Sequence, residues 1–471
     1  MDRFEEAGSR DTGWHGTGSF QSSTMGNDML KSRLLTAGAA LLATALSAST
    51  ALADITILAW PGEPSESAFR KVLDLYNSTE GAKNNSKASV IYFSQQGFKE
   101  KMLADVAAGS KEFDVMLTST YDVGLYQPFM LPIDDLVTDK VYEVISKNAI
   151  ETQKFEGKTY GIPTDLSLHF LYYRNDLIDQ LNTDPAWKAK YEEISEKILG
   201  KKLSPKPADQ WDWDDFIASA LFFTKSINPD SPTRYGTVLQ MKNLLYNMML
   251  WQGTVASNGG DWRDKDGNIT VDSPAFKRGL EIYKIITDNE ATPGDSSTYE
   301  YGEANSVFGA GQVAFMLQWN AAVPEFSGDK YPAVAGKLGL SHEPAGPEGP
   351  KTHFHSLGLG INKNTEKLDE AKAFLSWLAT AEPMKLYAKE GGSPPLAEGP
   401  MAEIAGDRPE MVLMGEHAAK YGFVMDGATS AKAMGIYTNM AENFTGYWTG
   451  EIEQDEAIAN VTADMQKALA P

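Results

Sequence analysis

Short apolar runs alternate with segments of helical periodicity over the first part of the chain. Residues 55–60 form an apolar run that a Pro-Gly pair ends, so they are predicted to be a buried strand. From Phe69 onward, apolar residues recur three and four positions apart, which predicts a helix with one apolar face. Residues 90–93 and 113–117 have the pattern of two further strands. This alternation predicts parallel strands in a doubly wound α/β lobe.

The middle of the chain, roughly residues 175–310, is richer in helical patterns, and an apolar strand is predicted at 313–317. Ligands of α/β lobes gather where the strands reach their carboxyl ends. Trp60, residues 118–122 and Trp319 each follow or end a predicted strand, so a binding site is expected near them.

The amino-terminal segment has the three parts of a secretory signal peptide. A basic start at Met29 precedes an apolar run at 34–46, and Ala-Leu-Ala comes directly before Asp54. The run is shorter than the roughly 20 residues that a membrane-spanning helix needs. We predict a signal peptide at 29–53 with cleavage before Asp54, which leaves residues 1–28 as a non-native extension. A buried core helix is the alternative interpretation of the same apolar run.

Charge and cysteine content exclude several kinds of binding partner and of membrane anchor. The chain has 42 Lys and Arg against 64 Asp and Glu, a formal net charge of −22, which argues against a nucleic-acid groove and against docking on anionic lipid. It has no cysteine, so neither a disulfide nor a lipid-modified amino-terminal cysteine is available. We therefore expect a protein that is free in an extracytoplasmic space, most simply the bacterial periplasm. A monomer without cofactor or metal is also expected.

The order of several motifs resembles the family of extracellular solute-binding proteins of ABC importers that includes maltose-binding protein. The resemblance covers about residues 54–470, and its motifs occur in the family's order. They are Leu-Ala-Trp at 58–60, Lys-Met-Leu-Ala at 101–104, Phe-Asp-Val at 113–115, Leu-Pro-Ile-Asp-Asp-Leu at 131–136, Gly-Lys-Thr-Tyr-Gly-Ile-Pro at 157–163, Leu-Tyr-Tyr-Arg-Asn-Asp-Leu at 171–177, Trp-Asp-Trp-Asp-Asp-Phe at 211–216 and Gly-Gln-Val-Ala-Phe-Met at 311–316.

This resemblance implies a two-lobed periplasmic-binding-protein fold of type II, in which a hinge closes two α/β lobes around a ligand. It implies that the protein is not an enzyme and that it delivers a carbohydrate or polyol to a membrane permease. The chain would cross between the lobes at Thr164–Ser167 and again at His353–Gly358. The lobes it implies are 54–164 with 358–405, and 167–352 with 406–471.

Strand ends supply most of the candidate ligand-binding residues. A sugar site needs aromatic platforms and short polar groups that exchange hydrogen bonds with hydroxyls. Trp60 and Trp319 are the candidate platforms, although either could be a core residue, and Asn320 follows Trp319. Three candidates follow the third strand: Thr120 with a hydroxyl, Tyr121 with a phenol and Asp122 with a carboxylate. The Asp122 carboxylate could instead cap the next helix.

The resemblance adds further candidates. Ser167 stands where maltose-binding protein has a glutamate that contacts the ligand. Either Asp165 supplies the carboxylate in this chain, or the ligand differs. Tyr437 falls near a stacking aromatic of the family, and Gly392 lies in a matching Gly-rich loop that could be a plain turn. Trp251 lies in a helical stretch and is as compatible with core as with site. The remaining candidate is His355, which pairs with His353 in a motif that lacks the further ligands of a metal site.

Two rival functions remain open. The same fold could bind a polyamine or another cation between acidic and aromatic residues. A secreted glycoside hydrolase would need two carboxylates on either side of the scissile bond, and no motif in the sequence marks such a pair.

Overall fold

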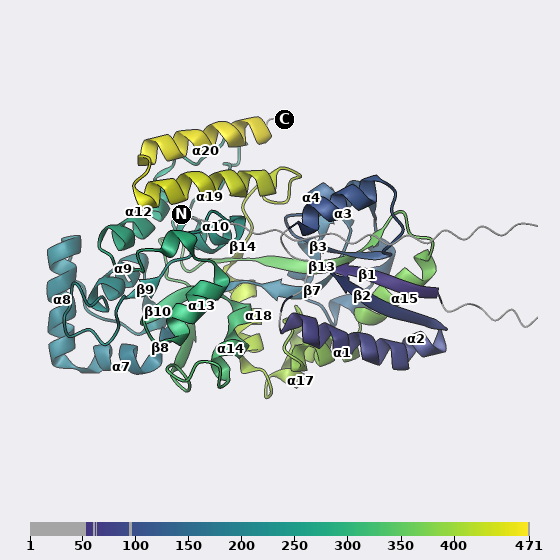
Figure 1. The fold of residues 1–471 in the computed structure, drawn as a ribbon, viewed down its shortest axis with the longest axis horizontal. Helices are drawn as coiled ribbons and strands as arrows, with labels where there is room; N and C mark the ends of the chain where they lie inside the picture. The colour runs from purple at the N-terminus through teal and green to yellow at the C-terminus, as the bar shows by residue number, and fades with distance from the viewer. Residues whose placement is uncertain (1–52, 60–61, 63, 94–96, 470–471) are drawn as a thin grey trace, which may run out of the picture. The chain divides into compact units, whose positions relative to one another are not determined.

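The structure is a computed structural model that describes residues 53–59, 62, 64–93 and 97–469. The predicted extension at 1–28, the predicted signal peptide up to residue 52 and Trp60 lie outside the described residues. Within them the fold is built on two β-sheets, each with its own helices (Figure 1). Two pairs of short strands stand apart from these sheets: β5 (Lys154–Phe155) with β6 (Lys158–Thr159), and β12 (Thr352–His353) with β14 (Gly422–Phe423).

The first sheet has six strands in the order β2-β1-β3-β13-β4, with β7 also paired to β13. β1 is parallel to β2 and β3, which confirms the α/β class predicted from the alternation, and β13 is antiparallel to β3. The strands are β1 (Ala53–Ala59), β2 (Ser86–Tyr92), β3 (Val115–Ser119), β4 (Met130–Leu131), β7 (Ile162–Ser167) and β13 (His355–Asn362).

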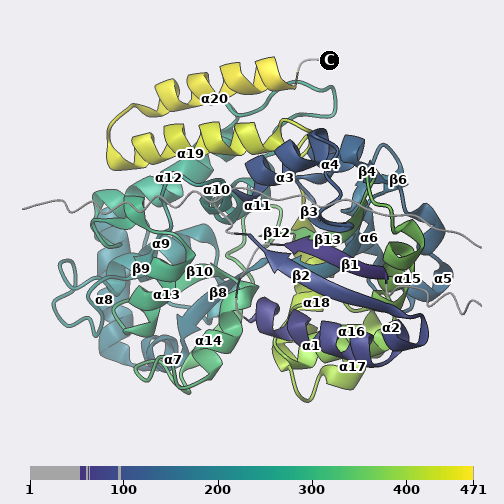
Figure 2. The ribbon, with the colours of Figure 1, turned by 45° about the vertical axis from the view of Figure 1, so that its right-hand side comes forward.

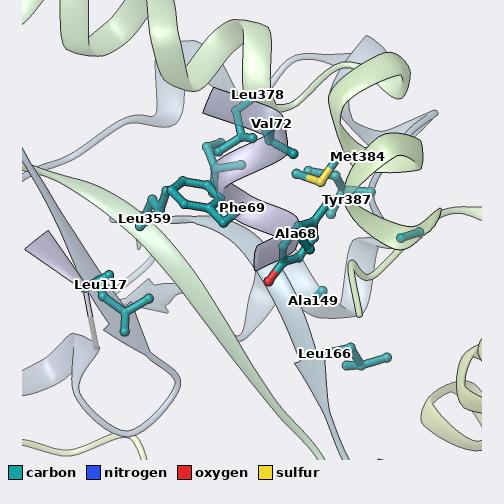
Figure 3. Packing of buried hydrophobic residues seen from close by; sticks show 14 of the residues in the cluster. Ala68, Phe69, Val72, Leu117, Ala149, Leu166, Leu359, Leu378, Met384 and Tyr387 are labelled. Carbon is teal, nitrogen blue, oxygen red and sulfur yellow. The ribbon is translucent and has the colours of Figure 1, made fainter. Parts of the chain in front are cut away.

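Helices cover both sides of the first sheet, with α1 and α3 on opposite sides (Figure 2). The apolar face of α1 packs against α16, where Phe69 and Val72 meet Met384 and Tyr387 (Figure 3). The helices associated with this sheet are α1 (Ser65–Ser78), α2 (Glu80–Lys83), α3 (Phe98–Ala107), α4 (Val123–Tyr126), α5 (Asp139–Tyr142), α6 (Lys147–Glu151), α15 (Leu368–Leu378), α16 (Ala381–Lys389) and α17 (Glu398–Ile404).

The second sheet has four strands in the order β11-β8-β10-β9, with β10 antiparallel to β8 and parallel to β9. They are β8 (His169–Arg174), β9 (Thr237–Val238), β10 (Phe315–Trp319) and β11 (Leu338–Ser341). The helices that follow β8 in the chain and precede β12 are α7 (Asn175–Thr183), α8 (Pro185–Leu199), α9 (Trp213–Phe222), α10 (Leu245–Trp251), α11 (Gly253–Ser257), α12 (Pro274–Asp288), α13 (Tyr301–Gly309) and α14 (Val323–Ser327). Three more complete the fold: α18 (Pro409–Tyr421), α19 (Ala433–Thr449) and α20 (Gln454–Ala468).

Local sequence sets where several of these helices begin. The Ser273 hydroxyl accepts a hydrogen bond from the Phe276 N–H at 3.4 Å, and proline occupies the first position of α12. At α9, Asp212 and Asp215 accept hydrogen bonds from each other's backbone N–H groups, a reciprocal capping box. Among the described residues, no helix is both long enough and apolar enough to cross a membrane.

The chain passes from the first sheet to the second and later returns. β7 ends at Ser167 and β8 begins at His169, so Leu168 carries the chain from the first sheet to the second. The return is at Phe354, between the end of β12 and the start of β13. Leu168 lies one residue beyond the first predicted crossover segment, and Phe354 lies within the second.

Candidate functional site

A cavity of about 350 Å³ lies between the two sheets and takes its lining from both. That volume is within the range of small-molecule sites. Its lining includes six aromatic residues and three carboxylates. The aromatic residues are Phe69, Tyr92, Tyr246, Tyr301, Trp319 and Tyr387, and the carboxylates are Glu66, Asp165 and Glu300.

Asp165 is the polar centre of the wall that the first sheet provides, which we call the first wall. The Tyr387 hydroxyl lies 2.9 Å from Asp165 Oδ1 and 2.7 Å from Oδ2. The Ser393 N–H and the Ser65 hydroxyl donate to Oδ1 at 3.3 and 3.4 Å. Burial raises the pKa of Asp165, and these hydrogen bonds partly oppose that rise. The wall therefore holds a carboxylate in a fixed position at the edge of the cavity.

Trp319 forms the centre of the wall on the side of the second sheet, the second wall. It ends β10 and is 9% exposed. Its ring packs edge-on against His169, with centroids 4.1 Å apart, and its carbonyl accepts a hydrogen bond from the Tyr172 hydroxyl at 2.7 Å. The strand-end rule thus predicted a residue that lines the cavity and whose backbone is held in place.

Asn320 lines the cavity, but its side chain also holds the first crossover. Its Oδ1 accepts from the Leu168 N–H at 2.9 Å, and its Nδ2 donates to the Leu166 carbonyl at 3.2 Å. Asp165, Ser167 and His355 line the cavity too. Five of the twelve predicted residues are therefore brought together at one site.

The predicted residues after β3 bond to the protein and do not line the cavity. The Thr120 hydroxyl accepts from the Ser356 N–H at 3.0 Å, which joins the end of β3 to β13. The Tyr121 hydroxyl pairs with His353 Nε2 in a buried contact. Asp122 occupies the N-cap position of α4 without a capping bond from its side chain, and pairs with Lys99 at 2.9 Å.

Trp251 and Tyr437 belong to the hydrophobic core behind the second wall. The Trp251 side chain has 0% exposure, donates to the Gly279 carbonyl at 2.9 Å and packs on Phe444. Tyr437 is equally buried, and its hydroxyl donates to Gln252 Oε1 at 2.9 Å. Both side chains are directed into the core by the apolar faces of their helices, α10 and α19, so neither reaches the cavity.

Gly392 supports Tyr387 and does not line the cavity. Its N–H donates to the Tyr387 carbonyl at 2.9 Å, so this amide already has a partner. A Cβ at this position would lie 2.4 Å from the Tyr387 ring. Glycine is required here because the ring that carries the hydroxyl partner of Asp165 packs directly on the backbone.

Three neutral histidines lie at the crossovers. The rings of His169 and His353 stack with centroids 5.8 Å apart, and burial lowers the pKa of both. His355 packs against Trp319, and burial lowers its pKa to about 3. Glu343 is fully buried beside His169, 3.5 Å from its Nδ1, and burial raises the pKa of this carboxyl. No group of three metal-ligating side chains with the arrangement of a metal site occurs in the part of the chain that the structure describes.

Several lining residues were not among the sequence candidates. Tyr92 is the last residue of β2, so the strand-end rule that selected Trp60 would have found it. Phe69 and Tyr387 lie on helices whose apolar faces predict core. Tyr246 and Glu300 come from loops or helix starts around α10 and α13 and have no local signal.

Two β-sheets with their own helices, connected by two chain crossovers and with a cavity between them, are the architecture of a two-lobed binding protein. Residues 60–385, more than half of the chain, match the family model described as bacterial extracellular solute-binding protein. The chain belongs to this family.

Individual relatives and a solved structure support this family assignment. The chain is similar to a lactose-binding protein of Rhizobium radiobacter, 26% identical over 76% of this chain and 77% of the relative. It is 24% identical to a probable ABC transporter-binding protein of Deinococcus radiodurans, over 62% of this chain and 64% of that protein, less than two thirds of its length. The fold matches that of maltose-bound MalE3 of T. maritima with a TM-score of 0.71 and 20% identity, over 88% of this chain and 99% of that one.

Proposed function

We propose that the protein is the solute-binding component of an ABC importer and that it captures a carbohydrate or polyol in the cavity. The observation that carries this proposal is the composition of the cavity, where aromatic rings from both walls surround a hydrogen-bonded carboxylate. Rings of this kind pack on the C–H faces of sugars, and the carboxylate accepts hydrogen bonds from hydroxyls. The names of the lactose-binding relative and the maltose-bound neighbour support the same class of ligand.

Capture would work by a shift between open and closed arrangements of the two lobes. A ligand can favour the closed state only if it binds that state more tightly, so it has to contact both walls at once. Asp165 would supply contacts on one side and Trp319 on the other, while Leu168 and Phe354 absorb the rotation. Delivery to a membrane permease, and the assignment of residues 54–164 with 358–405 and of 167–352 with 406–471 to the two lobes, belong to the same proposal.

A panel of monosaccharides, disaccharides, oligosaccharides, polyols and polyamines tests the ligand class. We expect some carbohydrates to raise the melting temperature of the purified protein and to be recovered unchanged, because a binder releases what it captures. Small-angle scattering at saturation should show a smaller radius of gyration. Recovery of cleaved sugars would make the protein a glycoside hydrolase, and a response to polyamines alone would give it a different cargo.

We also propose that the protein is exported to the periplasm as a monomer and is cleaved before Asp54. The basic start, apolar run and Ala-Leu-Ala of residues 29–53 support this processing. Amino-terminal sequencing of the exported protein should begin at Asp54. An exported chain that retains residues 1–28 would contradict the cleavage.

A further inference from the structure

The carboxylate at the centre of the first wall lacks a cationic partner. Asp165 accepts hydrogen bonds from the Tyr387, Ser65 and Thr164 hydroxyls and from the Ser393 N–H, and all four donors are neutral. No lysine or arginine lies within ion-pair distance of it among residues 53–59, 62, 64–93 and 97–469. A carboxylate that is withdrawn from water without a counter-charge destabilises the state that buries it.

The other two carboxylates of the cavity are already neutralised. Glu66 pairs with Arg70 at 2.8 Å, and Glu300 pairs with Lys242 at 2.8 Å. No lysine or arginine lines the cavity in the described part of the chain. None of the undescribed residues that are close in the sequence to lining residues is a lysine or an arginine. They are Trp60, Pro61, Glu63, Ser94, Gln95 and Gln96.

The histidine of the lining adds no positive charge. Burial lowers the pKa of His355 to about 3, so this side chain is neutral at the pH of most bacterial environments. Among the described residues that line the cavity, Asp165 is therefore the carboxylate without a cationic partner.

Aromatic rings lie around that charge. Tyr387, which donates to Asp165, packs edge-on against Phe69 with ring centroids 6.3 Å apart, and both residues line the cavity. Trp319 faces the cavity from the second wall. Aromatic faces attract cations, and more strongly where water is excluded.

We infer that the solute carries one positively charged nitrogen, as an amino sugar or an aminated polyol does, and that Asp165 pairs with this nitrogen. This inference rests on the proposed function, since it names the charge of the carbohydrate that the same cavity takes. An anionic sugar would meet an unpaired carboxylate and is rejected. Close charge pairs in sheltered interfaces have coupling energies that correspond to about tenfold or more in affinity.

Matched pairs of sugars test this charge preference directly. Titration calorimetry of the full chain would compare glucose with glucosamine, galactose with galactosamine, and each amino sugar with its N-acetyl form. The N-acetyl form keeps the nitrogen and loses the charge. We expect the charged form that fits best to bind at least about tenfold tighter than both of its neutral counterparts. Added salt should weaken its binding and leave that of the neutral sugars unchanged.

Two substitutions assign the preference to Asp165. Asp165→Asn is isosteric and should abolish the preference for the charged form, while Asp165→Glu should retain part of it. Glu66→Gln is the matched control, because Glu66 lines the same cavity with its charge already paired, and it should keep the preference. Melting curves without ligand establish that each variant folds, and the salt dependence of the wild type tests the preference without any variant.

The outcomes separate this inference from the proposed function. Neutral sugars that bind as tightly as their amino forms would overturn the inference and leave the proposed function standing. A preference that survives Asp165→Asn would also overturn it. If polyamines bind while no sugar does in either form, the charge assignment holds and the carbohydrate function is wrong.

Discussion

The two walls of the cavity use different chemistry. The first wall is organised around Asp165, whose charge is held by a network of hydroxyls and a backbone amide. The second wall is organised around Trp319, which is supported by the neutral ring of His169. Charge and hydrogen bonds determine how a ligand is oriented, whereas aromatic area contributes affinity with less directional preference. If the proposed function holds, we expect the first wall to select the ligand and the second wall to supply much of the energy that favours closure.

The walls also differ in how they are tied to the hinge. On the second wall, Asn320 follows Trp319, and its side chain bonds to the Leu168 N–H and the Leu166 carbonyl. The Thr352 hydroxyl bonds to the N–H and the carbonyl of His169, at 2.9 and 3.0 Å, so the two crossovers are joined to each other. The residue next to Trp319 is therefore bonded directly to the first crossover.

The largest effect is expected on the second wall. Trp319→Ala should weaken binding of the best ligand by about 2–4 kcal/mol, because a buried aromatic at the centre of a site contributes that much. Calorimetry with the wild type and the variant measures this loss.

Trp251→Ala is the matched control for that substitution. It removes a tryptophan of the core and should lower the free energy of unfolding by about 3–5 kcal/mol. If Trp319→Ala caused the larger loss of stability without ligand, Trp319 would be a core residue and the second wall would be wrongly defined.

The second-largest effect is expected when the hydrogen-bond network of the first wall is weakened. Tyr387→Phe removes the hydroxyl that bonds both oxygens of Asp165, and hydrogen bonds to a charged group contribute about 1.5–3 kcal/mol. We expect affinity to fall by up to that amount while the ring stays packed on Gly392. Tyr437→Phe is the control, since its hydroxyl bonds Gln252 in the core, and it should leave affinity unchanged. Equal losses in the two variants would mean that Tyr387 acts through stability alone.

The smallest effect for a single residue is expected from the histidines behind the second wall, which make the free energy of unfolding depend on pH. Histidines titrate near pH 6.5 in an unfolded chain, whereas burial lowers the pKa of His169, His353 and His355 in the fold. Below that pH the unfolded state binds more protons, so the free energy of unfolding falls as pH decreases. We expect a loss of about 1 kcal/mol per histidine between about pH 7 and 5.5.

Urea unfolding at several pH values measures that slope. Glu343 acts in the opposite direction, because burial raises its pKa and the folded state keeps a proton that the unfolded state releases. His355→Asn removes one of the three histidines, so it should reduce the dependence of the free energy of unfolding on pH by the contribution of one histidine. A slope that His355→Asn leaves unchanged would show that this histidine is not shielded from water in the fold.

The amino-acid sequence determined the class of fold and the parts of the site that depend on strand direction. Alternating apolar runs predicted the parallel strands β1, β2 and β3, and the expectation that ligands gather at strand ends selected Trp319, the last residue of β10. The same expectation also selected Thr120 and Asp122, which do not line the cavity. A strand end specifies the edge of a sheet, but the contacts that form there decide whether a side chain faces the cavity or bonds to a neighbouring strand.

The tertiary structure decided which distant residues complete the site. Tyr387 and Ser393 lie more than 200 positions after Asp165, and their contacts with it arise from the return of the chain through Phe354 to the first sheet. A helical apolar face predicts that Tyr387 is buried, but not that its hydroxyl ends at a carboxylate. In the same way, Trp251 and Trp319 are both buried tryptophans, and only the packing of α10 against α19 places the first in the core. Periodicity determines which face of an element is apolar, whereas the packing of whole elements determines which part of that face borders a cavity.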